Sequence, residues 1–466
     1  MSSSPLRLPV AEILKLYEKK RLSPVEVTQA CLKQVLKYNP VLNALCHMDE
    51  RLALHQAKAS EKRWAKGAPL GVLDGIPTTL KDTVNVKGWP TRFGSKTTSA
   101  LPQRDDSPQV ARLREAGAVF IGKTTTPEYG HKGVTDSPLC GITRNPWNLH
   151  KTPGGSSGGA AVAAATGMGY LNLGGDAGGS LRIPASFSGV FGFKPSPGLV
   201  PAWPPSLFSS FSAGGPMTRC VADAAYMLDV ITQQDFRDWH NLPLPPMQFV
   251  KNLKSPPKLK IAWAPAINGI QAQPGVREVL EQKLPLLKKL GSVDEIRLDA
   301  PGLIDVFNKH WMAIATHLVA AIPQKQHKDM DPRLLHWAAR GASISLHDYL
   351  EAERARMTIG EYFKGILTTY DILVTPATAM PAFDTGMNMP MGPKGKPWDD
   401  WTPFTYPANM AKLPAAVLPA GMTKDGLPVG IQVMSGFLKD TLLLQACLAL
   451  EEKLDFTPWL ETKKEG

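Results

Sequence analysis

The sequence predicts an α/β fold in which a central mixed, largely parallel, twisted sheet is covered by helices on both faces. Two observations carry this prediction. Short apolar runs alternate with helical patterns in the first half of the chain, and further apolar runs follow near its end. Near-continuous apolar runs are typical of strands buried on both faces, which favours parallel pairing. With 43% hydrophobic and 20% charged residues, the 466-residue chain has the composition of a globular protein.

The first predicted helix starts at Ser23. Pro24 occupies its first position and Glu26 supplies the partner of a capping box. Asn39 and Pro40 are predicted to end this helix, because the residue before a proline disfavours helical backbone.

A βαβ pattern follows. Residues 76–81 form the first predicted strand, 107–117 a helix and 118–122 a second strand, and another short strand is expected at 170–173. The second half of the chain continues the pattern with predicted strands at 258–263, 371–375 and 429–433 and a helix at 442–454.

Two long segments separate these later elements. The stretch to about residue 361 is predicted mostly helical, and residues 381–408, rich in Met, Pro, Gly and Trp, are predicted as a long loop. Because both ends of the chain contribute strands to one predicted sheet, we predict a single domain, 1–466. Its core motif region is 71–200, and a helical, more variable insertion lies at about 225–365.

Charge and hydropathy favour no macromolecular partner. The net charge is +11, but the basic residues are spread along the chain without interleaved aromatics, so we expect a solvated surface and no nucleic acid. The apolar run 158–175 carries Thr166 and Asn172 and lacks flanking basic anchors, so we expect no membrane span. The N-terminal segment lacks the apolar core of a signal peptide, and we expect a cytoplasmic monomer or homodimer.

The five cysteines predict neither a disulfide framework nor a zinc site. Their number is odd and no pair has CxxC spacing. We expect small buried hydrophobes in a reducing compartment, at Cys31, Cys46, Cys140, Cys220 and Cys447.

Lys81 ends the predicted strand 76–81. A lysine at a strand end is often a surface residue. If it is buried, however, its pKa falls because burial disfavours the charged form, and a neutral lysine can act as a base.

Two glycine-rich segments follow. Residues 152–159 (Thr-Pro-Gly-Gly-Ser-Ser-Gly-Gly) predict a tight loop entering a small helix, and the missing Gly-Lys-Ser/Thr ending excludes a Walker motif. Residues 174–184 predict a glycine turn that exposes the Ser180 hydroxyl and gathers backbone N–H donors for an oxyanion, although a purely structural turn has the same pattern. Only His131 and His150 lie nearby, and a GxSxG elbow is absent, so a Ser-His-Asp triad is disfavoured.

Together these segments closely resemble the amidase signature family. Its Gly-Gly-Ser-Ser-Gly-Gly and Gly-Gly-Ser-x-Arg blocks are both present, with the strand lysine upstream. The resemblance continues through 143–148, 193–196 and 426–432, covers most of the chain, and is weakest at about 225–365. One departure is Lys412-Leu413-Pro414, where family members often have Gly-Leu-Pro.

The resemblance implies a role for each site residue. Ser180 would be the nucleophile, Ser156 the bridging serine with a cis peptide bond, and Lys81 the base, with no metal or organic cofactor required. The resemblance also implies an oxyanion hole formed by the backbone N–H groups of Ala177, Gly178, Gly179 and Ser180. The side chains of Asp176 and Arg182 would support the site and pair with each other.

Two functions stay open. One is a stand-alone hydrolase of aryl or alkyl amides, or of carbamates (urethanes) and esters. The other is the glutamine-hydrolysing subunit of a tRNA-dependent amidotransferase. A catalytically inactive scaffold is disfavoured because all three relay residues are present. Apolar side chains in two segments suit aryl or alkyl substrates, although they could equally be core residues: Met387, Met389, Met391, Trp398, Trp401 and Phe404, and Trp203, Phe208 and Phe211.

Overall fold

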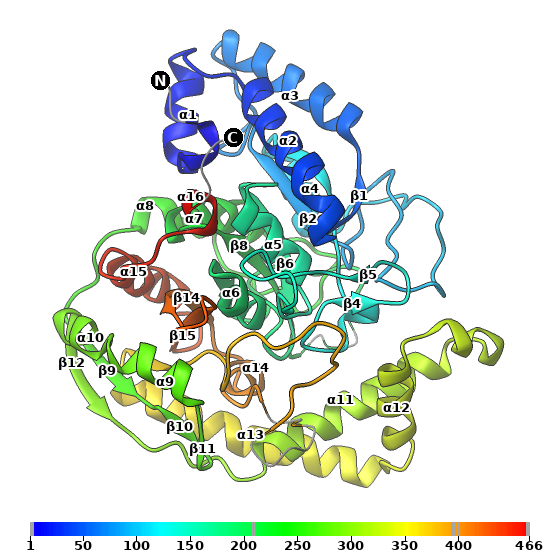
Figure 1. Ribbon diagram of the computed structural model, residues 1–466, viewed down its shortest axis with the longest axis vertical. Helices are drawn as coiled ribbons and strands as arrows, with labels where there is room; N and C mark the ends of the chain where they lie inside the picture. The colour runs from blue at the N-terminus through cyan, green and yellow to red at the C-terminus, as the bar shows by residue number, and fades with distance from the viewer. Residues whose placement is uncertain (1–3, 207, 209, 393–397, 399–400, 463–466) are drawn as a thin grey trace.

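A computed structural model describes residues 4–206, 208, 210–392, 398 and 401–462 (Figure 1). Its centre is an 11-stranded sheet built from all parts of the chain. In spatial order the strands are β1 (Leu45–Met48), β3 (Val119–Thr124), β2 (Pro77–Lys81), β6 (Leu171–Asp176), β8 (Ala213–Thr218), β7 (Phe191–Lys194), β14 (Ala415–Met422), β15 (Pro428–Ser435), β13 (Ile372–Pro376), β9 (Leu259–Trp263) and β12 (Gly291–Glu295).

The predicted α/β architecture with a mixed sheet is confirmed. Parallel ladders join β3, β2 and β6 at one flank and β13, β9 and β12 at the other, while antiparallel ladders run between them. Every residue of β2, β3, β13 and β15 is buried. Because successive side chains of a strand point to opposite faces, both faces of the sheet are covered.

All six predicted strands are present as β2, β3, β6, β9, β13 and β15. Other strands of the sheet were not predicted from the sequence. β8 reads Ala-Gly-Gly-Pro-Met-Thr, a composition depleted in strand formers, and is extended because it pairs with β6 and β7. β14 contains Pro419 and Gly421, where a bulge shifts its register against β15.

Helices pack around this sheet. The α-helices are α1 (Val10–Glu18), α2 (Pro24–Leu42), α3 (Glu50–Ala65), α4 (Pro108–Glu115), α5 (Gly158–Thr166), α6 (Arg182–Ser188), α7 (Val221–Ile231), α8 (Phe249–Asn252), α9 (Pro274–Glu281), α10 (Leu284–Leu290), α11 (Leu303–Ala320), α12 (Pro332–Gly341), α13 (Leu346–Thr369), α14 (Tyr406–Met410), α15 (Asp440–Glu451) and α16 (Trp459–Thr462). Smaller elements are three 3₁₀ turns, η1 (Pro5–Arg7), η2 (Glu128–Gly130) and η3 (Gln324–Asp329), and the hairpins β4 (Asp136–Ser137)–β5 (Gly141–Ile142) and β10 (Ala266–Ile267)–β11 (Ile270–Gln271).

The start of α2 is as predicted, but its end is not. Ser23 and Glu26 form the reciprocal capping box. The helix continues past Pro40 to Leu42 and stops only where Asn43 adopts a left-handed conformation with φ 51°. Pro40 lies in the last turn, where it removes only one N–H from the helix.

The segment 225–365 combines helices with strands of the central sheet. Figure 1 shows α11, α12 and α13 gathered at the end of the molecule opposite α1–α3. The same segment also supplies β9 and the unpredicted β12 to one edge of the sheet.

In the predicted loop 381–408, residues 393–397 and 399–400 lie outside the described part of the chain, and α14 begins at Tyr406.

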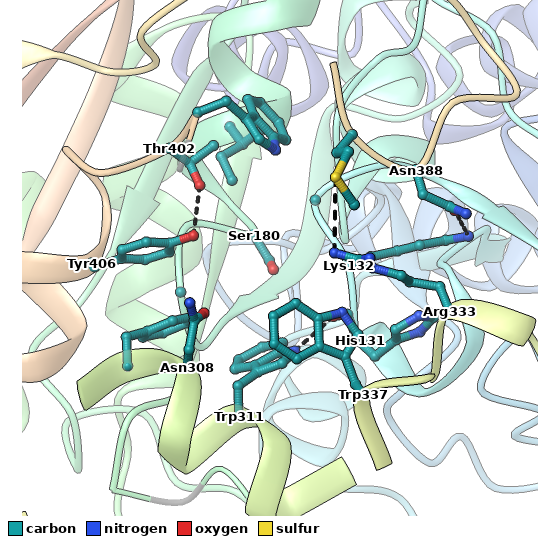
Figure 2. Close-up of a pocket in the computed structure, with 16 residues that line it drawn as sticks. His131, Lys132, Ser180, Asn308, Trp311, Arg333, Trp337, Asn388, Thr402 and Tyr406 are labelled. Carbon is teal, nitrogen blue, oxygen red and sulfur yellow. Dashed lines mark hydrogen bonds between the residues drawn. The ribbon is translucent and has the colours of Figure 1, made fainter. Parts of the chain in front are cut away.

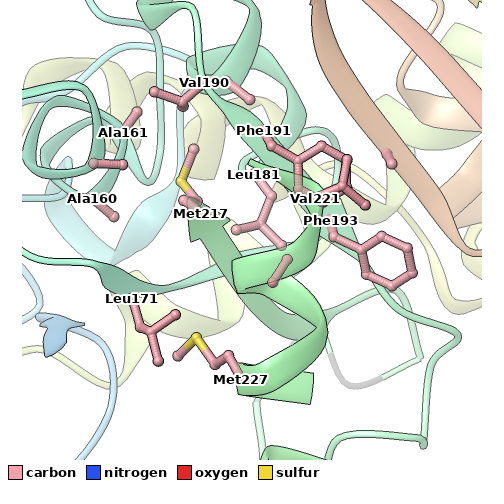
Figure 3. Close-up of a cluster of buried hydrophobic side chains, with 14 of the residues drawn as sticks. Ala160, Ala161, Leu171, Leu181, Val190, Phe191, Phe193, Met217, Val221 and Met227 are labelled. Atoms are coloured by element: carbon pink, nitrogen blue, oxygen red, sulfur yellow. The ribbon is translucent and has the colours of Figure 1, made fainter. Parts of the chain in front are cut away.

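Buried hydrophobic side chains cluster between α5, β6 and α6, the elements that adjoin the two glycine segments (Figure 3). α5 consists only of Gly, Ala, Val and Thr and is buried throughout. A Cβ on Gly159 would lie 2.5 Å from the Ala44 carbonyl oxygen and 2.4 Å from the Thr125 hydroxyl, so the small residues let α5 approach the sheet. Because the apolar run 158–175 is divided between α5 and β6, it forms no continuous helix. Among the described residues, no helix has the length and apolarity to cross a membrane.

The expectation that all five cysteines are small buried hydrophobes is only partly correct. Cys31 and Cys447 are buried, but Cys46 is exposed and Cys140 is partly exposed. Cys46 lies in β1, the edge strand of the sheet, and the sequence does not show which strand forms an edge.

Candidate active site

Lys81 is the last residue of β2 and is buried, with 3% of its surface exposed. Its Nζ lies 2.7 Å from the Ser156 Oγ and 2.9 Å from the Ser157 Oγ. Burial lowers the pKa of Lys81 from 10.5 to about 7, although the nearby Asp176 carboxylate opposes this shift. The amine is therefore largely neutral in mildly alkaline solution.

The first glycine segment presents Ser156 to this amine. The Gly155–Ser156 peptide bond is cis. A Cβ on Gly155 would lie 2.7 Å from the Val134 backbone, so only glycine fits this approach. The Ser157 hydroxyl donates to the Gly175 carbonyl at 3.1 Å and accepts from the Gly175 N–H at 3.2 Å, which joins the loop to β6.

Ser180 lies in the turn between β6 and α6. It is 8% exposed and lines a pocket. Its carbonyl accepts the Ser157 N–H at 3.1 Å, so the two glycine segments are directly connected. Gly179 has φ 132°, and a Cβ there would lie 2.6 Å from the Thr405 hydroxyl, which explains the glycine before the serine.

Asp176 and Arg182 form a fully buried, bidentate ion pair beneath this turn. The two nitrogen–oxygen distances are both 2.9 Å. Arg182 also donates to the Thr405 carbonyl and to the side chains of Gln432 and Asn409. Burial alone would raise the pKa of Asp176, but the Arg182 charge and hydrogen bonds hold it well below its usual range.

Two backbone N–H groups of the turn contact the Asp176 carboxylate. The Gly179 N–H donates to the Asp176 carboxylate at 2.7 Å, as does the Leu181 N–H at 3.1 Å. A buried carboxylate needs such donors, so both N–H groups help to hold Asp176 in place. The N–H groups of Ala177, Gly178 and Ser180 remain as candidate oxyanion donors.

We expect Arg182→Met to lower the free energy of unfolding by about 3–5 kcal/mol, because it leaves the Asp176 carboxylate buried without its cation. Urea unfolding would measure the change. Arg297→Met is a matched control, since Arg297 pairs with Asp299 on the surface at 81% and 56% exposure and should cost less than about 1 kcal/mol. Equal losses in the two variants would contradict the role given to the buried pair.

Ser180 lines a pocket with one aromatic and one polar side. Figure 2 shows Ser180 with Tyr406 and Asn308 on one side and His131 and Lys132 on the other. The pocket is lined by His131, Lys132, Gly133, Gly178, Ser180, Ile183, Phe307, Asn308, Trp311, Arg333, Trp337, Asn388, Met389, Trp401, Thr402 and Tyr406.

Stacked rings build the aromatic side. Phe307 stacks on Tyr406 with centroids 4.0 Å apart and on Trp311 at 5.1 Å, and Phe208 lies 4.5 Å beyond Trp311. A Cβ on Gly178 would lie 2.6 Å from the Phe307 ring, so the stack reaches the turn that carries Ser180.

Polar residues, among them Lys132 and His131, form the opposite side. The Lys132 Nζ is held by the Asp136 and Asp331 carboxylates and by the Asn388 side chain. His131 is buried, and burial lowers its pKa to about 4 although the Asp331 charge opposes the shift, so the ring is neutral at pH 7. Its Nδ1 lies 2.7 Å from the Glu128 carbonyl oxygen, which makes Nδ1 the protonated nitrogen.

Of the nine apolar residues proposed from the sequence, only some reach the pocket, and Met391 is exposed. Met389 and Trp401 do line the pocket, and Phe208 supports Trp311 behind it. Phe211 and Phe404 belong instead to the buried core. Phe307, Trp337 and Tyr406 were missed, because no local motif distinguishes a pocket aromatic from a core aromatic. Lys412 stands where the family often has glycine. Its φ of 59° lies in the left-handed region that glycine favours, so a lysine adopts the backbone conformation of a glycine here.

Fold and site together place a buried lysine against two serine hydroxyls, in a loop bonded directly to the turn that carries Ser180. The family model described as "Amidase" matches residues 26–444. An acylamidase of Rhodococcus erythropolis is 33% identical over 453 residues, covering 95% of this chain and 94% of that protein. A glutamyl-tRNA(Gln) amidotransferase subunit of Cyanothece is 31% identical over 481 residues, covering 97% and 98%. The crystal structure of a bacterial aryl acylamidase of the amidase signature family superposes with a TM-score of 0.89 at 28% identity, covering 97% of both chains.

The chain belongs to the amidase signature family. It is an amidase-family hydrolase that acts on amides.

Proposed function

We propose that this protein is a stand-alone amidase that cleaves the C–N bond of aryl and alkyl carboxylic amides through an acyl-enzyme on Ser180. One observation carries the proposal. The buried Lys81 amine lies 2.7 Å from the Ser156 hydroxyl, in the loop bonded directly to Ser180. A buried amine of lowered pKa can accept a proton, and a histidine is not needed.

The mechanism follows from these groups. Neutral Lys81 accepts the Ser156 hydroxyl proton while Ser156 accepts that of Ser180, and the Ser180 Oγ bonds to the substrate carbonyl carbon. The N–H groups of Ala177, Gly178 and Ser180 stabilise the oxyanion. The proton returns through Ser156 to the departing amine as the C–N bond breaks. Water then attacks the acyl-enzyme by the same relay and releases the carboxylic acid.

We expect the catalytic efficiency, kcat/KM, to rise with pH up to about 7 and to level above it. The base must be neutral, and its neutral fraction grows tenfold per pH unit below the Lys81 pKa of about 7. A pH profile of kcat/KM with a neutral anilide substrate would measure this rising part of the curve, the limb near pH 7. A profile that still rises steeply between pH 8 and 10 would show that Lys81 keeps an ordinary pKa and would contradict the mechanism.

The aromatic stack supports aryl and alkyl substrates. A stacked wall beside the nucleophile binds flat, apolar groups. The relatives include both an acylamidase and an amidotransferase component, so sequence similarity alone does not separate the two functions. Amides and carbamates can both be cleaved by acyl transfer to a serine. An aryl carbamate (urethane) is therefore a further candidate substrate for the same pocket.

A hydrolysis screen of the purified single chain tests the proposal. It should compare a para-nitroanilide, a small aliphatic amide, an aryl carbamate and glutamine. We expect the anilide to be cleaved by the chain alone and glutamine to be a poor substrate. Glutaminase activity that appears only with partner subunits, without anilide cleavage, would support the amidotransferase role instead.

We expect Trp311→Ala to raise the KM for the anilide about tenfold and to leave the small aliphatic amide nearly unchanged, because only the larger substrate reaches the stacked wall. Steady-state kinetics on both substrates would measure the difference. Trp239→Ala is the matched control, since Trp239 is 79% exposed and lies outside the pocket. Equal effects on the two amides would show that the aromatic wall does not take part in substrate recognition.

A further inference from the structure

The aromatic side of the active-site pocket contains a carboxamide. Asn308 lies in α11 between two residues of the stacked wall, directly after Phe307 and one turn before Trp311. All three line the pocket together with Ser180 and Tyr406. In Figure 2 the Asn308 side chain points from α11 toward the side of the pocket where Tyr406 and Ser180 lie.

The protein leaves the hydrogen-bonding capacity of this amide unused. Asn308 is half-buried, and within the described part of the chain its side chain makes no hydrogen bond. Its neighbours differ: the Thr402 hydroxyl donates to the Tyr406 hydroxyl at 3.0 Å, and the Trp311 Nε1–H donates to the His131 carbonyl at 2.8 Å. A carboxamide has two N–H donors and one carbonyl acceptor, and leaving them without partners costs free energy. The amide is therefore available to a molecule that enters the pocket.

α11 holds this amide in a fixed position. The Trp311 bond to His131 ties the helix to the loop on the other side of the pocket. One turn of helix away, the His310 Nε2 lies 3.0 Å from the Glu353 carboxylate of α13. A recognition group on a rigid helix loses little conformational freedom when it binds, so it can discriminate between similar ligands.

The surroundings of Asn308 favour an uncharged partner. Among the described lining residues, the charged side chains of Lys132 and Arg333 lie on the opposite side of the pocket (Figure 2). The Lys132 ammonium is already paired with the Asp136 and Asp331 carboxylates. A neutral amide beside aromatic rings is complementary to a flat ring that carries an uncharged polar group.

We propose that Asn308 is a specificity-determining residue that selects aryl amides whose ring carries an uncharged oxygen substituent, such as a hydroxyl or methoxy group. The ring packs against the wall of Phe307 and Trp311, and the Asn308 Nδ2–H donates to the substituent oxygen. A hydroxyl can in addition donate to the Asn308 Oδ1. This inference rests on the proposed amidase function, because it concerns the substrate of the same pocket.

Ligand binding to the full-length Ser180→Ala variant tests the proposal without turnover. The ligands are acetanilide and benzamide, each unsubstituted or with a hydroxyl or methoxy group at the meta or para position, so that the ring lies on either side of the scissile bond. Isothermal titration calorimetry gives the dissociation constants. In at least one of the two series we expect a substituted amide to bind about fivefold more tightly than the unsubstituted one, the effect of one neutral hydrogen bond.

Substitutions of Asn308 in the same background separate recognition from a structural role. Asn308→Leu should abolish the preference for both substituents, because leucine has a similar volume and no polar atom. Asn308→Asp should keep the preference for the hydroxyl, which can donate to a carboxylate, and lose that for the methoxy group, which cannot. A purely structural role would change the affinity for all the ligands alike.

Lys309→Leu is the matched control. It places the same side chain on the next residue of α11, where Lys309 pairs with Asp305 at the surface and does not line the pocket. We expect this variant to keep the preference. Should Asn308→Leu fail to fold, the opposite responses expected of Asn308→Asp to the two substituents decide the question.

Three results would overturn the proposal. They are equal affinities for substituted and unsubstituted amides in both series, a preference that persists in Asn308→Leu, and no binding of any of these amides. Failure of the amidase assignment is distinguishable, because it is read from hydrolysis by the wild type. A binding preference that depends on Asn308, found together with no cleavage of aryl amides by the wild type, would contradict the assigned reaction and leave the recognition by Asn308 standing.

Discussion

We expect Ser180→Ala to lower the rate of amide hydrolysis by about 10⁴-fold or more, because it removes the atom that bonds to the substrate carbonyl. The variant should also fail to accumulate an acyl-enzyme when mixed with a para-nitrophenyl ester, a substrate whose acylation is fast. Steady-state rates and intact-protein mass after mixing would measure the two effects separately.

Ser188→Ala is the matched control for this change. Ser188 lies eight residues after Ser180, in α6, and is buried. Within the part of the chain that the structure describes, its hydroxyl makes one long hydrogen bond, of 3.4 Å to the Pro153 carbonyl. We expect this variant to keep near-normal rates and the same acyl adduct. An adduct that survives in Ser180→Ala would assign the nucleophile to another residue.

Lys81→Met should lower the rate by about 10³-fold while the fold is kept, because methionine fills a similar volume but cannot accept the Ser156 proton. Lys81→Arg should not restore activity, since a guanidinium does not become neutral in proteins. The rate should be measured across pH, because the limb near pH 7 should disappear in both variants.

A second buried lysine provides the control. Burial also lowers the pKa of Lys194 to about 7, yet its Nζ donates to the Pro195 carbonyl at 2.9 Å, and none of its described hydrogen bonds is to a serine hydroxyl. We expect Lys194→Met to keep most of the turnover and the limb near pH 7. If the limb moved with Lys194 and not with Lys81, the base would have to be reassigned.

Local sequence determines much of the fold. The capping box of α2 needs only Ser23 and Glu26 three residues apart, and the six predicted strands are apolar runs whose composition alone indicates burial. β8 and β12 could not be found in this way. They are extended because neighbouring strands offer hydrogen-bond partners, and those neighbours come from distant parts of the chain.

The same distinction between local sequence and tertiary structure applies to the candidate site. The sequence alone determined the candidate lysine, the two serines and the glycines around them, since glycine spacing is a local constraint on the backbone. Only the tertiary structure decided that Lys81 is buried with a pKa near 7, that Gly179 donates to Asp176, and that the pocket wall comes from α11. A pKa depends on solvent exclusion and on charges brought near in space, and a pocket depends on side chains from separate elements, so neither can be predicted from any short stretch of sequence.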